Sequence, residues 1–259
     1  MAENLKTALL QANLFWEDIE ANRTFFERKI NDLSEDVDLI ILPEMFTTGF
    51  SMNAEVLAEP PNGPTLQWMQ KMASERDAAI TGSIITSENG KFYNRMYFVF
   101  PDGSFEKYDK RHTFTLAKEN ETYASGEERL IVTYKDWRIC PLVCYDLRFP
   151  VWSRNTEDYD LLIYVANWPA PRIAAWDALL KARAIENMCY CIGVNRVGTD
   201  GKDLDYVGHS AVYDSLGKMI SENTSENEFS EEVNLQKNHL AETRSQLRFL
   251  QDRDKFTLH

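Results

Sequence analysis

Two short, uninterrupted apolar runs constrain the fold of this chain more than any other part of its sequence. They occupy residues 38–43 (DLIILP) and 160–166 (DLLIYVA). A strand with one face in water alternates apolar and polar residues, whereas a strand in a parallel sheet that is covered on both faces is apolar throughout. The two runs therefore predict buried strands of an α/β protein.

The elements predicted around these runs occur twice in the same order. In the first half they are a strand at 5–14, a helix at 17–33, the strand at 38–43, a helix at 65–76, a strand at 78–85 and a hairpin at 97–108. In the second half they are a strand that ends at Cys144, a helix from about residue 149, the strand at 160–166, a helix at 171–188, a strand at 189–195 and a hairpin at 210–221. Two such halves predict a four-layer α-β-β-α sandwich with two mixed sheets and internal pseudo-two-fold symmetry.

The length of the chain favours one domain. A chain of 259 residues can bury roughly 75% of the surface that its unfolded form exposes, so we expect residues 1–259 to form a single domain. Residues 222–232 are acidic and poor in apolar side chains, which predicts a loop or a weak extension, and residues 239–252 predict a final amphipathic helix. Because this extension, about 222–259, has no core of its own, we expect it to dock on the body or on a dimer partner.

Charge and composition exclude several classes of protein. The net charge of −13 argues against binding to nucleic acid or to an anionic membrane, since both need a basic surface. No apolar run approaches the roughly 20 residues of a membrane span, and the N-terminus has no secretory signal pattern. The four cysteines and four histidines match no zinc or redox spacing, so we expect a cytoplasmic protein without a metal or other cofactor.

Cys144 is the first candidate for a chemical role. A buried run at 139–143 ends at this cysteine and breaks at once into the segment YDLRFP, which predicts a strand-to-helix turn. Backbone N–H groups at such a turn favour a thiolate over a thiol, which would activate a nucleophile. From this stretch alone, a buried structural cysteine remains an equal alternative.

Glu44 and Lys110 are the other two candidates. Glu44 follows the run at 38–43, at the end of a strand where α/β sheets bind ligands, although it could also cap a helix. Lys110 follows the hairpin at 97–108 in a charged cluster that could equally be a solvated surface. With Cys144 they form a set for acyl transfer, in which sulfur attacks a carbonyl carbon, a carboxylate takes the thiol proton and an ammonium stabilises the oxyanion.

The chain resembles the nitrilase superfamily of carbon–nitrogen hydrolases in seven segments that follow that family's order. They are LPEMFTTGF (42–50), YNRMYFVFPDG (93–103), YDKRHTF (108–114), CYDLRFP (144–150), ANWP (166–169), ARAIEN (182–187) and GHSAVYDSLG (208–217). More narrowly, PEMFTTGFSMN, YDKRHTF and CYDLRFP resemble the omega-amidase branch. Enzymes of that branch hydrolyse the terminal amide of short 2-oxo dicarboxylic acid monoamides, such as 2-oxoglutaramate and 2-oxosuccinamate.

The resemblance assigns a role to each of these residues. It implies that Glu44 is the general base, that Lys110 is the cation of the oxyanion hole and that Cys144 is the nucleophile. The backbone N–H of Tyr145 would complete the oxyanion hole. The superfamily also has a second glutamate before the cysteine, and the spacing to a following glycine favours Glu119 over Glu121 in this role.

Residues that contact the substrate are predicted from their positions beside these motifs. Arg148 and Arg172 are candidates for binding the far carboxylate of a short anionic substrate. Phe46, Phe114 and Trp168 are candidates for an apolar wall, although aromatic side chains at such positions belong to the core more often. Arg148 could instead be structural, or lie in the homodimer interface that the resemblance implies.

Two alternatives to an omega-amidase remain at this point. The first is another amidase of the superfamily, such as a deaminated-glutathione amidase, a carbamoylase or a nitrilase. The second is a catalytically silent binding protein. The presence of Glu44, Lys110 and Cys144 together argues against the second alternative, because a binding protein has no need of all three.

Overall fold

The computed structural model of the chain describes residues 4–224 and 226–257, which leaves both ends of the chain and Ser225 of the predicted extension outside the description. The strands are β1 (Leu5–Gln11), β2 (Leu39–Ile41), β3 (Ala79–Glu88), β4 (Lys91–Val99), β5 (Phe105–Asp109), β6 (Val132–Tyr134), β7 (Trp137–Val143), β8 (Leu161–Ala166), β9 (Tyr190–Asn195), β10 (Val197–Thr199), β11 (Asp205–Val207), β12 (Ala211–Tyr213) and β13 (Phe229–Leu235). The α-helices are α1 (Ile19–Asn31), α2 (Ala54–Leu57), α3 (Pro64–Arg76), α4 (Glu119–Thr122), α5 (Pro150–Ser153), α6 (Ile173–Asn187) and α7 (Lys237–Leu247). Four short 3₁₀ helices are η1 (Thr115–Ala117), η2 (Cys144–Arg148), η3 (Ala170–Arg172) and η4 (Phe249–Asp252).

The strands form two mixed sheets, as the sequence predicts. One has the order β13-β1-β2-β3-β4-β5, the other has the order β12-β9-β8-β7-β6, and β10 and β11 form a separate hairpin. In the first sheet, parallel β1, β2 and β3 lie between antiparallel β13 and β4. In the second sheet, parallel β7, β8 and β9 lie between antiparallel β6 and β12. The same five-strand arrangement therefore occurs twice, in agreement with the predicted repeat.

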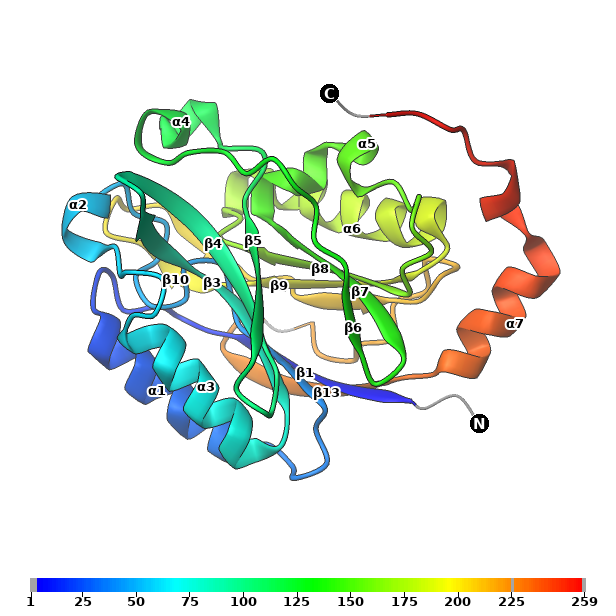
Figure 1. Cartoon of the computed structure of the whole chain (residues 1–259), viewed down its shortest axis with the longest axis horizontal. Coiled ribbons are helices and arrows are strands. Elements are labelled where there is room, and N and C mark those ends of the chain that lie inside the picture. Colours follow the sequence, from blue (N-terminus) through cyan, green and yellow to red (C-terminus); the bar gives the residue numbers. More distant parts are fainter. Residues whose placement is uncertain (1–3, 225, 258–259) are drawn as a thin grey trace.

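The two sheets stack between helices (Figure 1). Leu39 and Ile41 of β2 point into the core between the sheets. Ile40, between them, and Leu42 belong to the core beneath α1 and α3. Successive residues of a strand point to opposite faces, so a strand that is covered on both faces must be apolar at every position. The uninterrupted apolar run at 38–43 has this physical origin.

Helix α6 covers the outer face of the second sheet, where Gly193 of β9 permits a close approach. A Cβ atom at this position would lie 2.4 Å from a Leu180 methyl group and 2.7 Å from the Trp176 ring. Both distances are far shorter than a van der Waals contact, so any side chain on residue 193 would push α6 away from the sheet.

The helix expected from about residue 149 is much shorter than its counterpart α1. After Cys144 the chain forms η2 and then only one helical turn, α5, before it turns extended at Arg154. The side chain of Asn155 then donates to the Tyr159 carbonyl and accepts from the Tyr159 N–H, which closes a loop in place of further helix.

The sequence predicted a loop or a weak extension at 222–232. This prediction is wrong from Phe229 onward, because β13 begins there. β13 pairs with β1 along its whole length, with Phe229 opposite Gln11 and Leu235 opposite Leu5. Phe229, Val233 and Leu235 are buried. Glu231 interrupts this row of alternate apolar residues, and the partner strand is more than 200 residues away in the sequence, so the local pattern was too weak to predict a strand.

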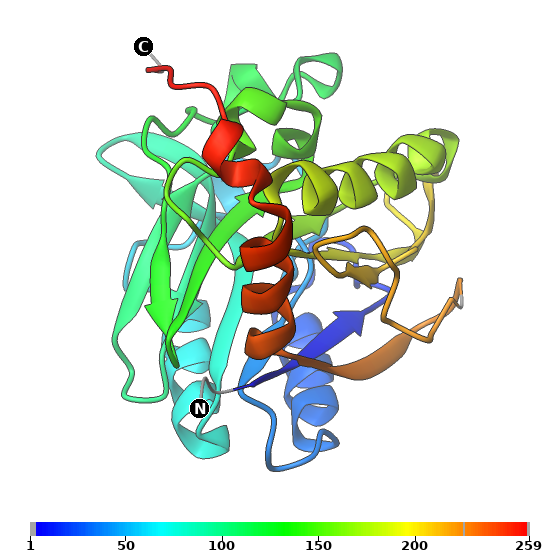
Figure 2. The ribbon, with the colours of Figure 1, turned by 90° about the vertical axis from the view of Figure 1, so that its right-hand side faces the viewer.

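Helix α7 lies along the side of the body, at the amino ends of the strands of the second sheet (Figure 2). Arg244 donates hydrogen bonds to the carbonyl of Met188, the carbonyl of Tyr159 and the Asp160 carboxylate. These three acceptors directly precede β9 and β8, so α7 contacts the body at the edge away from Glu44 and Cys144. The single-domain boundary at 1–259 and the homodimer stay predictions.

We predict that Arg244→Ala lowers the free energy of unfolding by about 1–3 kcal/mol, because it leaves the buried acceptors without their charged donor. Urea unfolding followed by circular dichroism would measure this change. Arg248→Ala is the matched control, since the side chain of Arg248 is exposed and, within the described residues, donates to the Ser245 carbonyl of its own helix end and makes no hydrogen bond to the body. Equal effects of the two substitutions would contradict the assigned docking contact.

Candidate active site

Four predicted residues meet where the carboxyl ends of strands from both sheets come together. Glu44 follows β2, Lys110 follows β5, Cys144 follows β7, and Glu119 begins α4. Glu44 and Glu119 are fully buried, Lys110 is 1% exposed and Cys144 is 9% exposed. The fold therefore brings two carboxylates, an ammonium and a thiol into one nearly water-free place.

Lys110 lies between the two carboxylates. Its Nζ is 2.9 Å from Glu44 Oε1 and 2.9 Å from Glu119 Oε2. Asn94 also donates to Glu44 Oε1, at 2.7 Å, and the backbone N–H of Asn167 donates to Glu44 Oε2, at 2.8 Å. Each oxygen of Glu44 thus accepts a hydrogen bond from a fixed donor, which offsets part of the cost of burying its charge.

Of the two glutamates that the sequence leaves open, the structure places Glu119 beside Lys110. Its Oε2 also accepts a hydrogen bond from the Phe114 N–H. The side chain of Glu121 is 62% exposed and lies 3.6 Å from Lys118 on the surface. Glu119 can therefore hold the ammonium of Lys110 in place, and Glu121 cannot.

Cys144 sits at a sharp turn that its neighbours hold in place. Its φ of +46° lies in the left-handed region that residues other than glycine rarely adopt. The buried Asp146 accepts hydrogen bonds from the Val143 N–H, the Tyr108 hydroxyl and the His112 N–H. These bonds connect the turn to β7, to β5 and to the chain that follows β5, and so hold Cys144 in its strained conformation.

Burial and the nearby charges shift the pKa of the Cys144 thiol. Burial raises the pKa of the Cys144 thiol well above its usual value, the charge of Glu44 raises it further, and Lys110 opposes them only in part. The N–H groups of the turn were expected to favour a thiolate, and this desolvation acts against them. A base must remove the thiol proton, and the Glu44 carboxylate is close enough to do so.

Lys110 stays charged in this setting. Burial lowers the pKa of its ammonium, but Glu119 and Glu44 together raise it above its usual value. Burial also raises the pKa of Glu119, against the attraction of Lys110. A permanently charged ammonium beside the thiol can stabilise an oxyanion that forms there.

A cavity of about 100 Å³ opens directly onto Cys144 and Lys110. Tyr145 lines it, and so do four of the five residues predicted to contact the substrate: Phe114, Arg148, Trp168 and Arg172. Lining residues that the sequence did not indicate include Phe50, Asn167, Asp200, Lys202 and Tyr206.

The fifth predicted contact residue, Phe46, does not line the cavity. Its ring is fully buried and packs edge-on against Phe26 at 5.5 Å, in the core beneath α1 and α3. Phe50, four residues further along the same loop, faces the cavity instead, with Lys110 Nζ 5.3 Å from its ring centre. The sequence showed an aromatic residue after Glu44, but not the direction in which the loop turns each ring.

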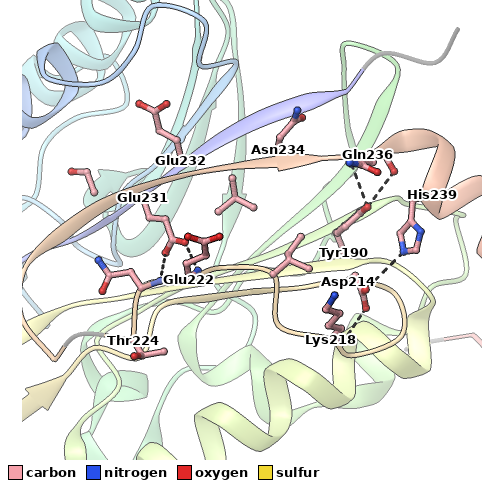
Figure 3. A pocket seen from close by; sticks show the side chains of 14 residues that line it. Tyr190, Asp214, Lys218, Glu222, Thr224, Glu231, Glu232, Asn234, Gln236 and His239 are labelled. Carbon is pink, nitrogen blue, oxygen red and sulfur yellow. Dashed lines mark hydrogen bonds and ion pairs between the residues drawn. The ribbon is translucent and has the colours of Figure 1, made fainter.

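A larger groove of about 1170 Å³ lies elsewhere, between β13, the turn after β12 and the start of α7 (Figure 3). Tyr190, Asp214, Glu231 and His239 are among the side chains around it. It lacks a cysteine and does not reach the cluster around Lys110, so it offers no counterpart of the thiol chemistry.

Two further searches cover residues 4–224 and 226–257. They find no group of three or more His, Cys, Asp or Glu side chains placed to hold a metal ion. They also find no helix with the length and apolar character that crossing a membrane requires.

A thiol beside a buried carboxylate and a fixed ammonium is a site for acyl transfer through sulfur. Residues 6–245 match the family model described as carbon-nitrogen hydrolase. The chain belongs to this family, which is the nitrilase superfamily of the sequence prediction, and it is a hydrolase of carbon–nitrogen bonds.

Individual relatives match over most of the chain. The chain is 44% identical to the omega-amidase YafV of Escherichia coli, over 98% of each chain. It is 34% identical to the 2-oxoglutaramate amidase of Bacillus subtilis, over 80% of each chain. The crystal structure of a CN-hydrolase superfamily protein from Xanthomonas campestris, which has an arsenic adduct in its active site, superposes with a TM-score of 0.96. That protein is 43% identical, and the match covers 99% of this chain and all of the other.

We predict that Lys110→Met lowers the free energy of unfolding by about 3–5 kcal/mol at pH 8, because it leaves two buried carboxylates without their cation. The pKa of Glu119 is already raised in the folded protein and rises further without Lys110. Folding then favours the protonated carboxyl, so the loss shrinks as pH falls from 8 toward 5. Urea unfolding at both pH values, with the exposed Lys91→Met as control, would test this; a loss that does not depend on pH would contradict it.

Proposed function

We propose that this carbon–nitrogen hydrolase is an omega-amidase. It hydrolyses the terminal amide of short 2-oxo dicarboxylic acid monoamides, 2-oxoglutaramate and 2-oxosuccinamate, to the acid and ammonia. The observation that carries the proposal is the cluster of Glu44, Lys110 and Cys144 at the end of a small cavity whose wall holds Arg148 and Arg172. The names of the Escherichia coli and Bacillus subtilis relatives support the same substrate class.

In the first step, Cys144 is the nucleophile and Glu44 is the general base. Glu44 accepts the thiol proton while sulfur attacks the amide carbon, which overcomes the raised pKa of the thiol. The carbonyl oxygen becomes an oxyanion, and the Lys110 ammonium and the Tyr145 backbone N–H stabilise it. Each such donor contributes on the order of 10²–10³ in rate at comparable sites.

The second step releases both products. Glu44 returns its proton to the leaving nitrogen, so ammonia departs and a thioester on Cys144 remains. Glu44 then takes a proton from water, whose oxygen attacks the thioester carbon. The carbon–sulfur bond breaks, the acid leaves, and the thiol regains its proton. Glu119 does not exchange protons in this scheme; it positions Lys110 through two hydrogen bonds.

Substrate recognition is assigned to Arg148, Arg172 and the aromatic wall. The guanidinium of Arg148 lies 4.8 Å from the Trp168 ring centre, and that of Arg172 lies 5.1 Å from the Phe114 ring centre. Within residues 4–224 and 226–257 neither guanidinium donates a hydrogen bond or forms an ion pair. Both are therefore free to bind the carboxylate of a short anionic substrate.

The size of the cavity helps to distinguish an omega-amidase from the alternative amidases of the superfamily. A volume of about 100 Å³ suits a short amide better than a molecule as large as deaminated glutathione. The activities of a carbamoylase and of a nitrilase are distinguished from that of an omega-amidase by a panel of substrates. A silent binding protein has no use for a thiol, a carboxylate and an ammonium in mutual contact. The homodimer and the cytoplasmic location remain predictions.

We predict that Cys144→Ala abolishes ammonia release from 2-oxoglutaramate and 2-oxosuccinamate, by at least about 10³-fold, because the nucleophile is gone. The panel should include glutamine, asparagine and a simple nitrile. Cys140→Ala is the matched control and should retain activity, because it removes a buried thiol within β7, four residues before Cys144. Rapid release from another member of the panel, and none from the 2-oxo amides, would contradict the substrate assignment.

A further inference from the structure

We propose that Lys202 is a specificity-determining residue that selects 2-oxo acid amides over the corresponding amino acid amides. The inference rests on the proposed function, since it assigns substrate selection to a residue of the same cavity. Lys202 lies in the connection between β10 and β11 and lines the cavity that opens onto Cys144.

The hairpin that carries Lys202 is held in a fixed shape by Asp200. One carboxylate oxygen of Asp200 accepts the backbone N–H of Lys202 at 2.8 Å and that of Leu204 at 3.1 Å. The other accepts the Tyr206 hydroxyl at 3.0 Å. Asp200 is only 7% exposed, so its carboxylate holds the exposed turn from the buried side. The backbone that presents Lys202 is therefore ordered before any substrate arrives.

The hairpin is also joined to the rest of the site. The buried Arg196 lies with its guanidinium 4.7 Å from the Tyr206 ring centre, and its side chain donates to the Val197 carbonyl at the start of β10. Strand β11 packs against η3, the turn that contains Arg172. The cavity wall thus carries Lys202 on one segment and Arg172 on the segment packed against it.

Three cations line this cavity besides Lys110. No hydrogen bond or ion pair holds the side chain of Lys202, Arg148 or Arg172 within the described part of the chain. The one carboxylate of the lining, Asp200, has both oxygens engaged by donors of its own hairpin. In a chain with a net charge of −13, such a group of unpaired cations favours an anionic ligand.

This charge distribution distinguishes two kinds of amide that share a carbon skeleton. A 2-oxo acid amide carries a carboxylate next to a neutral ketone, whereas the amino acid amide carries a carboxylate next to an ammonium. The cations attract the carboxylate of both, but they repel the ammonium of the second. Lys202 is exposed at the mouth of the cavity. Its ammonium adds to the repulsion that Arg148 and Arg172 exert on the ammonium of the amino acid amide.

The test compares Lys202→Gln and Lys202→Glu with the wild type on 2-oxoglutaramate, on glutamine and on a neutral amide of equal length. We expect Lys202→Gln to lower kcat/KM for 2-oxoglutaramate about fivefold, mainly through KM, as for an exposed ion pair. Turnover of the neutral amide should stay unchanged, and preference against glutamine should fall. Lys202→Glu should enlarge both effects, and higher salt should diminish the difference between wild type and variants. Lys91→Gln, which changes an exposed lysine at the start of β4, is the control.

The outcomes separate this inference from the proposed function. If the wild type hydrolyses 2-oxoglutaramate and Lys202→Gln leaves both KM and the preference against glutamine unchanged, the inference about Lys202 is wrong and the proposed function stands. If the wild type releases no ammonia from 2-oxo amides, the proposed function is wrong. Calorimetric binding of 2-oxoglutarate to the wild type and to Lys202→Gln then decides the inference, because equal affinities would overturn it.

Discussion

The ion pairs of Lys110 with Glu44 and Glu119 are the interaction on which the rest of the site depends. Two carboxylates and one ammonium are buried together. The free-energy cost of their desolvation is offset only when the carboxylate oxygens accept hydrogen bonds. Asn94 and the backbone of Asn167 supply further donors to Glu44. This arrangement holds the Glu44 carboxylate and the Lys110 ammonium beside a thiol whose pKa burial raises.

The stacking of two similar sheets creates this cluster. Glu44 comes from the first sheet, and Cys144 and Asn167 come from the second. Asn167 donates from its backbone to the Glu44 carboxylate and from its side chain to the Glu44 carbonyl. The end of β8 is thereby joined to the end of β2, which are the two uninterrupted apolar strands of the sequence. These contacts hold Glu44 of the first sheet against the end of the second sheet.

The sequence predicts the features that have a strong local pattern. The two apolar runs predict the central strands, and the residues at strand ends include Glu44, Lys110 and Cys144. Three features depend on tertiary contacts and were wrong or missed. The direction of Phe46 follows from a loop that turns it into the outer core, and β13 needs a partner at the other end of the chain. The raised pKa of the Cys144 thiol follows from burial that no local pattern reveals.

A thioester on Cys144 can be detected by acid quenching of the enzyme during turnover of 2-oxoglutaramate, followed by mass spectrometry of its peptides. The proposed mechanism predicts an acyl group on the peptide that contains Cys144, present in the wild type and absent from Cys144→Ala. Ammonia release without an acylated cysteine, or continued release by Cys144→Ala, would contradict the central claim that the reaction proceeds through a thioester at this residue.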